Sequence, residues 1–208
     1  MAAINNARGL VEYRHMMGHV SPRTRRYRVK ADAISGAAQK FAGDLVTLVS
    51  GDTVAVYGAG GSAASVTPVG VIRAVYDSNG RPFTHQLPAG GPFIPASTAG
   101  WVEVNIDPWQ TYLANADATV ASTHVGQFVD VTANTASTAA GRSGFSVRLA
   151  GAANTATNAL PLQIIAIGDN ERDSLTDTGL TGGESNQDVE VRIAVHGFGV
   201  GNVSLKVR

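Results

Sequence analysis

The chain has 208 residues, of which 44% are hydrophobic, 24 are glycine and none is cysteine. This length allows one large domain or two small ones, and the lack of cysteine excludes a disulfide framework, a thiolate zinc site and a cysteine nucleophile. Residues 1–40 hold eight of the 16 basic groups and two of the 16 acids, which leaves +6 there and −6 over the remaining 168 residues. We therefore expect a basic arm attached to a mildly acidic body.

The N-terminal segment is predicted to be an extended arm. Residues 1–30 are rich in Asn, Arg and His, and their apolar positions follow neither a helical nor a strand period for long. Pro22 breaks any helix there. Fully stretched, such an arm would reach on the order of 100 Å. We therefore divide the chain into an extended basic arm, 1–30, and a β-rich body, 31–208.

The first half of the body contains runs of β-branched residues separated by turns. Strands are predicted at 45–49, 53–57, 68–76 and 101–106, because these runs are rich in Val and Ile or alternate with period two. Asp77-Ser-Asn-Gly80 is predicted to be a turn, since an Asn-Gly pair favours positive φ. Residues 58–65 and 87–98 are expected to be loops, and Asp107-Pro108 should break or bend the chain.

The second half continues the same pattern. Strands are expected at 128–131, 145–149, 162–167 and 189–195, with one short helix within 114–124 and a flexible loop at 132–141. Many short strands joined by Gly, Asn and Asp turns predict an all-β fold, a β-sandwich or β-barrel body with an extended N-terminal arm. Whether the body divides into two subdomains near residue 114 is left open.

No apolar run reaches the ~20 residues that a membrane helix needs. The longest, at 160–167, is interrupted by Pro161 and Gln163 and is interpreted as a buried strand. Residues 1–10 lack the apolar core of a signal peptide. We expect a soluble protein that is made in a cytoplasm and does not bind membranes.

Two loops superficially resemble ligand sites. Tyr57-Gly-Ala-Gly-Gly-Ser follows a strand, but a strand-like segment with Pro68 comes next instead of the helix that phosphate binding needs. Asp169, Glu171, Asp173 and Asp177 alternate like calcium ligands, but Ser174 and Leu180 stand where an EF-hand loop requires Gly and an acid. We interpret these segments as a hairpin loop and a solvated acidic loop, and we expect no metal and no cofactor.

Histidines and serines offer no recognisable catalytic arrangement. His15 and His19 are four residues apart, as helical metal ligands would be, but the segment is not helical in pattern. His124 and His196 have no identifiable partner in the sequence, and Gly-x-Ser-x-Gly is missing. The chain is therefore expected not to be an enzyme.

The arm is the most informative segment for function. Its arginines alternate with Tyr and Met, which are typical of protein interfaces, whereas arginines with stacking tyrosines also suit nucleic acid. The mixture favours a protein surface, so nucleic acid is not the expected partner. The predicted docking residues are Arg8, Tyr13, Arg14, Met16, Met17, Arg23, Arg25, Arg26, Tyr27 and Arg28.

The order of segments in the body resembles that of tailed-phage capsid decoration, or cement, proteins. The resemblance lies in Gly126-Gln-Phe-Val-Asp-Val, Ala140-Gly-Arg-Ser-Gly-Phe-Ser-Val, Leu160-Pro-Leu-Gln-Ile-Ile-Ala-Ile, an Asp-Asn-Glu loop at 169–171, and Val189-Glu-Val-Arg-Ile-Ala-Val-His. Gly43-Asp-Leu-Val and Pro68-Val-Gly-Val-Ile are similar in kind, so the resemblance covers most of 41–197. Such proteins sit on the outer surface of the shell, often as trimers, and bridge neighbouring subunits.

The resemblance implies a virion structural protein that stabilises the outer capsid by bridging subunits of the major capsid protein. The expected assembly is a homotrimer made in the host bacterial cytoplasm and bound to the outer capsid surface. The alternatives are another virion β protein (a capsid, tail or fibre component) and a nucleic-acid-binding β-barrel. Trp101, Trp109 and Tyr112 also leave room for a sugar-stacking site in a lectin-like or esterase-like module.

Overall fold

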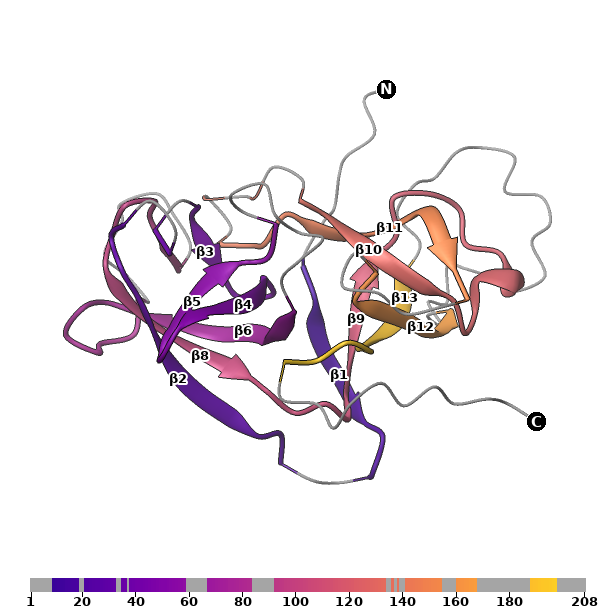
Figure 1. Ribbon diagram of the computed structural model, residues 1–208, viewed down its shortest axis with the longest axis horizontal. Helices are drawn as coiled ribbons and strands as arrows, with labels where there is room; N and C mark the ends of the chain where they lie inside the picture. The colour runs from indigo at the N-terminus through magenta and orange to yellow at the C-terminus, as the bar shows by residue number, and fades with distance from the viewer. Residues whose placement is uncertain are drawn as a thin grey trace.

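The computed structural model describes residues 9–18, 21–32, 35–36, 38–58, 67–83, 92–133, 136, 138, 141–154, 160–167 and 188–197. Their regular structure is almost entirely strand, which confirms the predicted all-β class (Figure 1). In these ranges the one helical element is a single 3-10 turn, Ser122–His124. No helix of the described chain is long and apolar enough to cross a membrane.

The first half of the chain forms a closed barrel of five strands in the order β2-β5-β4-β6-β8. β2 runs parallel to β5, and the other neighbours are antiparallel. The strands are β2 (Thr24–Val29), β4 (Leu45–Ser50), β5 (Thr53–Val56), β6 (Pro68–Tyr76) and β8 (Gly100–Asn105). Val102 and Val104 alternate with half-exposed Trp101 and Glu103, so period two places the valines in the barrel core.

A short two-stranded sheet accompanies the barrel. β3 (Lys40–Phe41) pairs with β7 (Phe93–Ile94), and the rings of Phe41 and Phe93 stack with centroids 5.1 Å apart. Stacked rings at this separation add to the stability that burial alone gives.

The second half, together with β1, forms a six-stranded antiparallel sheet in the order β1-β9-β13-β12-β10-β11. Its strands are β1 (Val11–His15), β9 (Gln110–Asn115), β10 (Phe128–Ala133), β11 (Phe145–Ala153), β12 (Leu162–Ile167) and β13 (Asp188–Ile193). The sheet curls on itself, because Ala116 bridges Val147 and Asp117 N–H donates to the Val147 carbonyl. β11 therefore meets the end of β9, and the curled sheet encloses a core.

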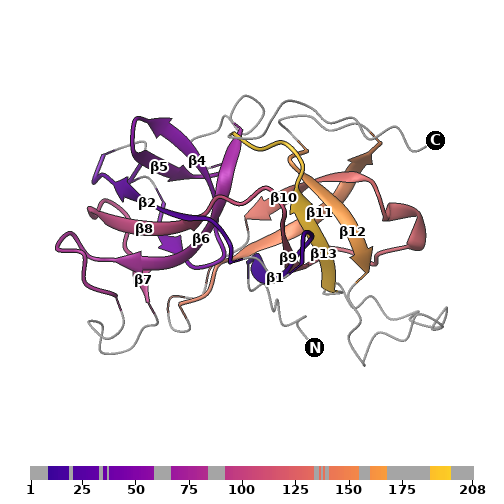
Figure 2. The ribbon, with the colours of Figure 1, turned by 90° about the horizontal axis from the view of Figure 1, so that it is seen from below.

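The two sheets lie side by side and share part of that core (Figure 2). The larger apolar cluster contains Leu45, Val56, Tyr57 and Val71 from the barrel half together with residues of the six-stranded sheet. The chain passes from one sheet to the other between β8 and β9, at 106–109, whereas residue 114 lies inside β9.

The extended arm is wrong for residues 9–18 and 21–30, because β1 and β2 in these ranges pair with strands of the same chain. β2 pairs along its whole length with β8, from Thr24 opposite Asn105 to Val29 opposite Gly100, and Tyr27 is fully buried in the barrel core. β1 pairs with β9, more than ninety residues further along the chain. The many arginines of β2 obscure a period-two pattern in its sequence, which places the apolar side chains inward. Residues 1–8 lie outside the described ranges.

Of the short helix expected within 114–124, only the 3-10 turn Ser122–His124 is present, and β9 continues to Asn115. The Ala-rich sequence suits a helix locally, but pairing of β9 with β13, from Arg192 opposite Thr111 to Asp188 opposite Asn115, overrides that preference.

Candidate functional site

Large apolar side chains are exposed along β1 and the turn that follows it. We call this set, Val11, Tyr13, Met16, Met17 and Trp109, the β1 patch; Met17 is 66% exposed and Tyr13 is 54% exposed. Met16 N–H donates to the Trp109 carbonyl over 2.9 Å, which places Trp109 beside the turn. Single exposed apolar residues are ordinary, but Tyr, Trp and Met exposed together on one strand and at the turn beside it are typical of protein interfaces.

Arg14 also lies in β1, but its guanidinium pairs with a carboxylate inside the protein. Its Nε donates to Glu190 Oε1 over 2.7 Å and its second guanidinium nitrogen to Oε2 over 2.6 Å. The Glu190 side chain is almost fully buried in β13, and the hydrogen bonds and charge of Glu190 raise the pKa of Arg14. Arg14 therefore neutralises an internal carboxylate, so its guanidinium is already engaged.

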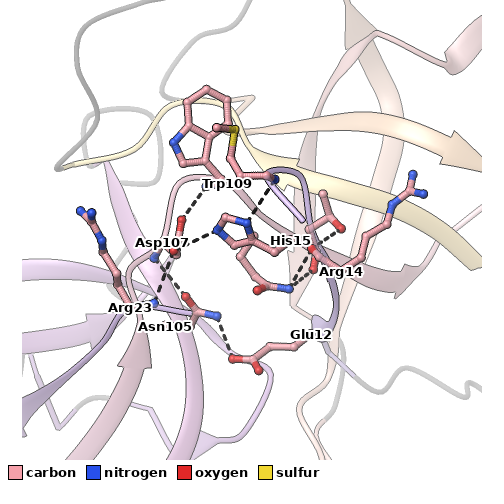
Figure 3. Close-up of polar contacts among 10 residues, drawn as sticks. Glu12, Arg14, His15, Arg23, Asn105, Asp107 and Trp109 are labelled. Carbon is pink, nitrogen blue, oxygen red and sulfur yellow. Dashed lines mark hydrogen bonds and ion pairs between the residues drawn. The ribbon is translucent and has the colours of Figure 1, made fainter. Parts of the chain in front are cut away.

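Asp107 holds the β1 patch in place (Figure 3). Its buried carboxylate accepts hydrogen bonds from Trp109 N–H over 3.0 Å and Arg23 N–H over 3.4 Å, and lies 3.2 Å from His15 Nε2. Burial disfavours the charged carboxylate, but the hydrogen bonds from Trp109, His15 and Arg23 outweigh it and keep the pKa of Asp107 below its ordinary value. One side chain thus fixes the end of β1, the start of β2 and the start of β9.

His15 and Asp107 lie together as the two members of a catalytic dyad would. His15 Nδ1 accepts the Met17 N–H over 3.2 Å, while Nε2 lies 3.2 Å from the Asp107 carboxylate. Both ring nitrogens therefore face groups of the protein itself. The arrangement orients the turn at 15–18.

A second network secures β1 from the barrel side. Asn105 Nδ2 donates to Glu12 Oε1 over 2.8 Å, and Asn105 Oδ1 accepts the Asp107 N–H over 3.0 Å. On the sheet side, Gln110 Nε2 and Thr111 Oγ1 both donate to the Arg14 carbonyl. The polar side chains of β8 and β9 therefore hold the backbone that presents the β1 patch.

The outer face of the barrel carries arginines that lie on aromatic rings. We call Arg26, Arg28, Tyr76 and Trp101 the arginine face. The guanidinium of Arg26 lies 4.3 Å from the ring centroid of Tyr76, and that of Arg28 lies 5.4 Å from Trp101. The strand register sets these contacts: Arg28 is opposite Trp101, which is in turn opposite Tyr76. Cation–π contact orients an otherwise mobile arginine.

A groove of about 480 Å³ runs between the two sheets. Its lining includes Leu10, Val11 and Glu12 of the β1 segment, Ile72 and Arg73 of β6, and Arg142. Arg73 lies 3.9 Å from Glu12 and 4.0 Å from Glu103, so its charge is shared between two carboxylates.

Asp44 and Lys40 form a buried pair of titratable groups where the barrel half meets the six-stranded sheet. Burial raises the pKa of Asp44 to about 7, against the opposing hydrogen bonds from Ser143 and Phe41 N–H and the charge of Lys40. Burial also lowers the pKa of Lys40 to about 8. Ser143 lies just before β11, so Asp44 connects the barrel half to the six-stranded sheet.

The ten predicted docking residues differ in how available they are to a partner. The exposed ones are Tyr13, Met16, Met17, Arg23, Arg25, Arg26 and Arg28. Tyr27 is wrong as a docking residue because it is buried, Arg14 is committed to Glu190, and Arg8 lies outside the described residues.

Sequence reasoning associated Trp101, Trp109 and Tyr112 with a sugar site and left Tyr76 unassigned. The structure places Trp101 and Tyr76 beneath arginines, Trp109 in the β1 patch and Tyr112 in the core. The described ranges contain no group of three His, Asp or Glu side chains arranged to hold a metal ion. Comparisons with protein-family models, curated proteins and solved structures found no match to this chain.

Proposed function

We propose that this protein is a phage virion structural protein that decorates the outer capsid surface and bridges subunits of the major capsid protein. In this proposal it is a non-enzymatic homotrimer, made in the host bacterial cytoplasm, that docks through the β1 patch and the arginine face. The resemblance of residues 41–197 to capsid decoration proteins supports the identity of the partner.

The observation that carries the proposal is the exposure of Met16, Met17 and Trp109 on a rigid support. Two strands and the Asp107 hydrogen bonds hold the backbone that carries these side chains, so little backbone entropy remains to be lost when a partner covers them. Tyr, Trp and Met at the centre of an interface supply most of its binding energy.

The arginines of β2 provide a second, charged component. Arg23, Arg25, Arg26 and Arg28 are exposed, and within the described chain no carboxylate lies within 4 Å of any of their guanidinium groups. A positive surface and an apolar patch on one protein suit a protein partner that offers both acidic side chains and an apolar recess. Several copies on one trimer would add avidity on a symmetric shell.

Cosedimentation with empty heads from the phage that carries this sequence tests the proposal. We expect the protein to sediment with the heads and the double variant Met17→Ser/Trp109→Ala to lose at least about tenfold in affinity, as interface anchors do. The matched control is Val49→Ser, which changes an exposed apolar residue of β4 outside the patch. Failure of the unaltered protein to bind heads would contradict the proposal.

A further inference from the structure

The arginine face has a specific geometry that a generally basic surface lacks. Arg26 and Arg28 are two residues apart on β2, so both point away from the barrel core in which Tyr27 is buried. Alternate residues of a strand are about 6.5–7 Å apart along the chain. The face therefore presents two guanidinium groups from alternate positions of one strand.

Each guanidinium contacts an aromatic ring and still has hydrogen-bond donors for a partner. The guanidinium carbons of Arg26 and Arg28 lie over the rings of Tyr76 and Trp101. The ring occupies one side of the guanidinium, and N–H groups on its other sides can form a two-pronged contact with a carboxylate or phosphate.

The carboxylate nearest to these arginines in the strand register is already engaged. Glu103 lies opposite Arg26 in the pairing of β2 with β8, but its Oε2 accepts a hydrogen bond from Tyr76 Oη over 3.0 Å, and Oε1 lies 4.0 Å from Arg73. In the part of the chain that the structure describes, no carboxylate comes within 4 Å of Arg26 or Arg28. The guanidinium groups of Arg26 and Arg28 therefore face outward, with N–H donors that no described carboxylate accepts.

We propose that the arginine face binds an extended acidic protein segment whose carboxylates stand at every second residue. Such a segment, laid along β2, repeats its carboxylates with the same spacing as Arg26 and Arg28. Each carboxylate then accepts both donors of one guanidinium. This inference specifies the chemistry of the partner that the arginine face recognises. It rests on the proposed function for placing that acidic segment on a capsid shell.

The stacking also argues against single-stranded nucleic acid on this face. Proteins that bind single strands place bases on open aromatic rings. Here the guanidinium groups of Arg26 and Arg28 already cover the rings of Tyr76 and Trp101. A base that stacked on the covered side of either ring would have to displace an arginine, which would remove the contact of that arginine with the phosphate as well.

Titration with two synthetic peptides of equal composition tests the spacing. One peptide alternates Glu and Thr over eight residues. The other, the blocked peptide, repeats Glu-Glu-Thr-Thr twice, so no two of its Glu residues are two positions apart; a 12-residue oligothymidylate is the third probe. We expect the alternating peptide to bind at least about fivefold more tightly than the blocked peptide, and more tightly than the oligothymidylate, because only the alternating one allows two bidentate contacts at once. Equal affinities for the two peptides, or tighter binding of the oligothymidylate, would overturn the inference.

The variant Arg26→Lys/Arg28→Lys keeps both charges but loses the planar forks. We expect it to bind both peptides equally, at the lower affinity, while Arg81→Lys at an exposed turn leaves the preference intact. A double variant that still prefers the alternating peptide refutes the role of these arginines. Peptide selectivity without sedimentation on heads refutes only the proposed function, and sedimentation without peptide selectivity refutes only this inference.

Discussion

Arg14 and Glu190 form a two-pronged ion pair that joins β1, the first described strand, to β13, the last. The two residues are separated by 176 positions, and β9 lies between their strands. Glu190 is buried whereas the Arg14 side chain is 58% exposed, so the arginine reaches from the surface to cover a charge inside the sheet.

Replacing Arg14 with Met is expected to destabilise the protein, because it leaves the Glu190 carboxylate buried without its cation. The loss should be about 1–3 kcal/mol, below the value for a fully buried pair since Arg14 is largely in water. Urea denaturation measures it. The double variant Arg14→Met/Glu190→Gln should recover part of the loss; a single variant as stable as the unaltered protein would show that the pair contributes nothing.

Asp44 should make the fold less stable as the pH rises from about 4 to 7. Burial raises the pKa of Asp44 from 3.8 to about 7, so the folded protein keeps a proton that the unfolded chain has lost. Stability is then greatest below the unfolded pKa and declines until the pH passes the folded one. Lys40, whose pKa is lowered to about 8, acts in the opposite direction, and its contribution rises between about pH 8 and 10.5.

Denaturation midpoints measured across pH 4–10 check this behaviour. Asp44→Asn should remove most of the decline between pH 4 and 7, because the amide does not titrate. Asp52→Asn, at an exposed turn, serves as the control and should leave the profile unchanged. A flat profile for the unaltered protein in this range is incompatible with a buried, titrating Asp44.

Asp107→Ala should loosen the β1 patch. The change removes the acceptor of the Trp109 and Arg23 N–H groups and the partner of His15, which together should cost about 2–3 kcal/mol. Hydrogen exchange followed by mass spectrometry should show faster exchange in peptides covering 15–23 and 107–110. Exchange that accelerates evenly over the whole protein would instead indicate general destabilisation without a local role.

Gly70→Ala should be far more harmful than Gly80→Ala. A Cβ at Gly70 would overlap the Asn105 carbonyl oxygen and Val104, where β6 crosses close to β8. Gly80 also has a positive φ, of 77°, but open space surrounds its Cβ position. We expect a loss of about 1 kcal/mol at Gly80 from backbone strain and several times that at Gly70, measured by thermal unfolding. Equal losses would show that backbone strain, and not the close approach, decides both.

Local pattern predicted much of the fold. The strand at 68–76 matches β6 because a long β-branched run is bounded by an Asn-Gly turn, and 162–167 matches β12 for similar reasons. β2 was missed because Arg25, Arg26 and Arg28 dominate its composition, although Tyr27 and Val29 carry the period-two signal. β9 was missed because its Ala- and Asn-containing sequence has no clear strand period.

The candidate site depends on relationships that a linear sequence does not display. Composition predicts Met16, Met17 and the arginines as docking residues; most of them are exposed, and docking itself stays a prediction. The stacking of Arg26 on Tyr76 requires the register of three strands, and Arg14 meets Glu190 only after the sheet has formed. No local signal could have distinguished Arg14, which neutralises an internal acid, from Arg26, which faces outward.

The position of β1 in the sheet implies an order of events during synthesis. The barrel strands, 24–105, are contiguous in the chain, but β1 must wait for β9, which begins at Gln110. At ~5–20 residues per second, about 95 residues separate the emergence of His15 and Gln110 by roughly 5–20 seconds. During that interval Leu45 and Val71 lack the partners that cover them in the finished protein. The nascent chain should therefore stay sensitive to proteases near its beginning until β9 has left the ribosome, which pulse proteolysis of stalled chains would reveal.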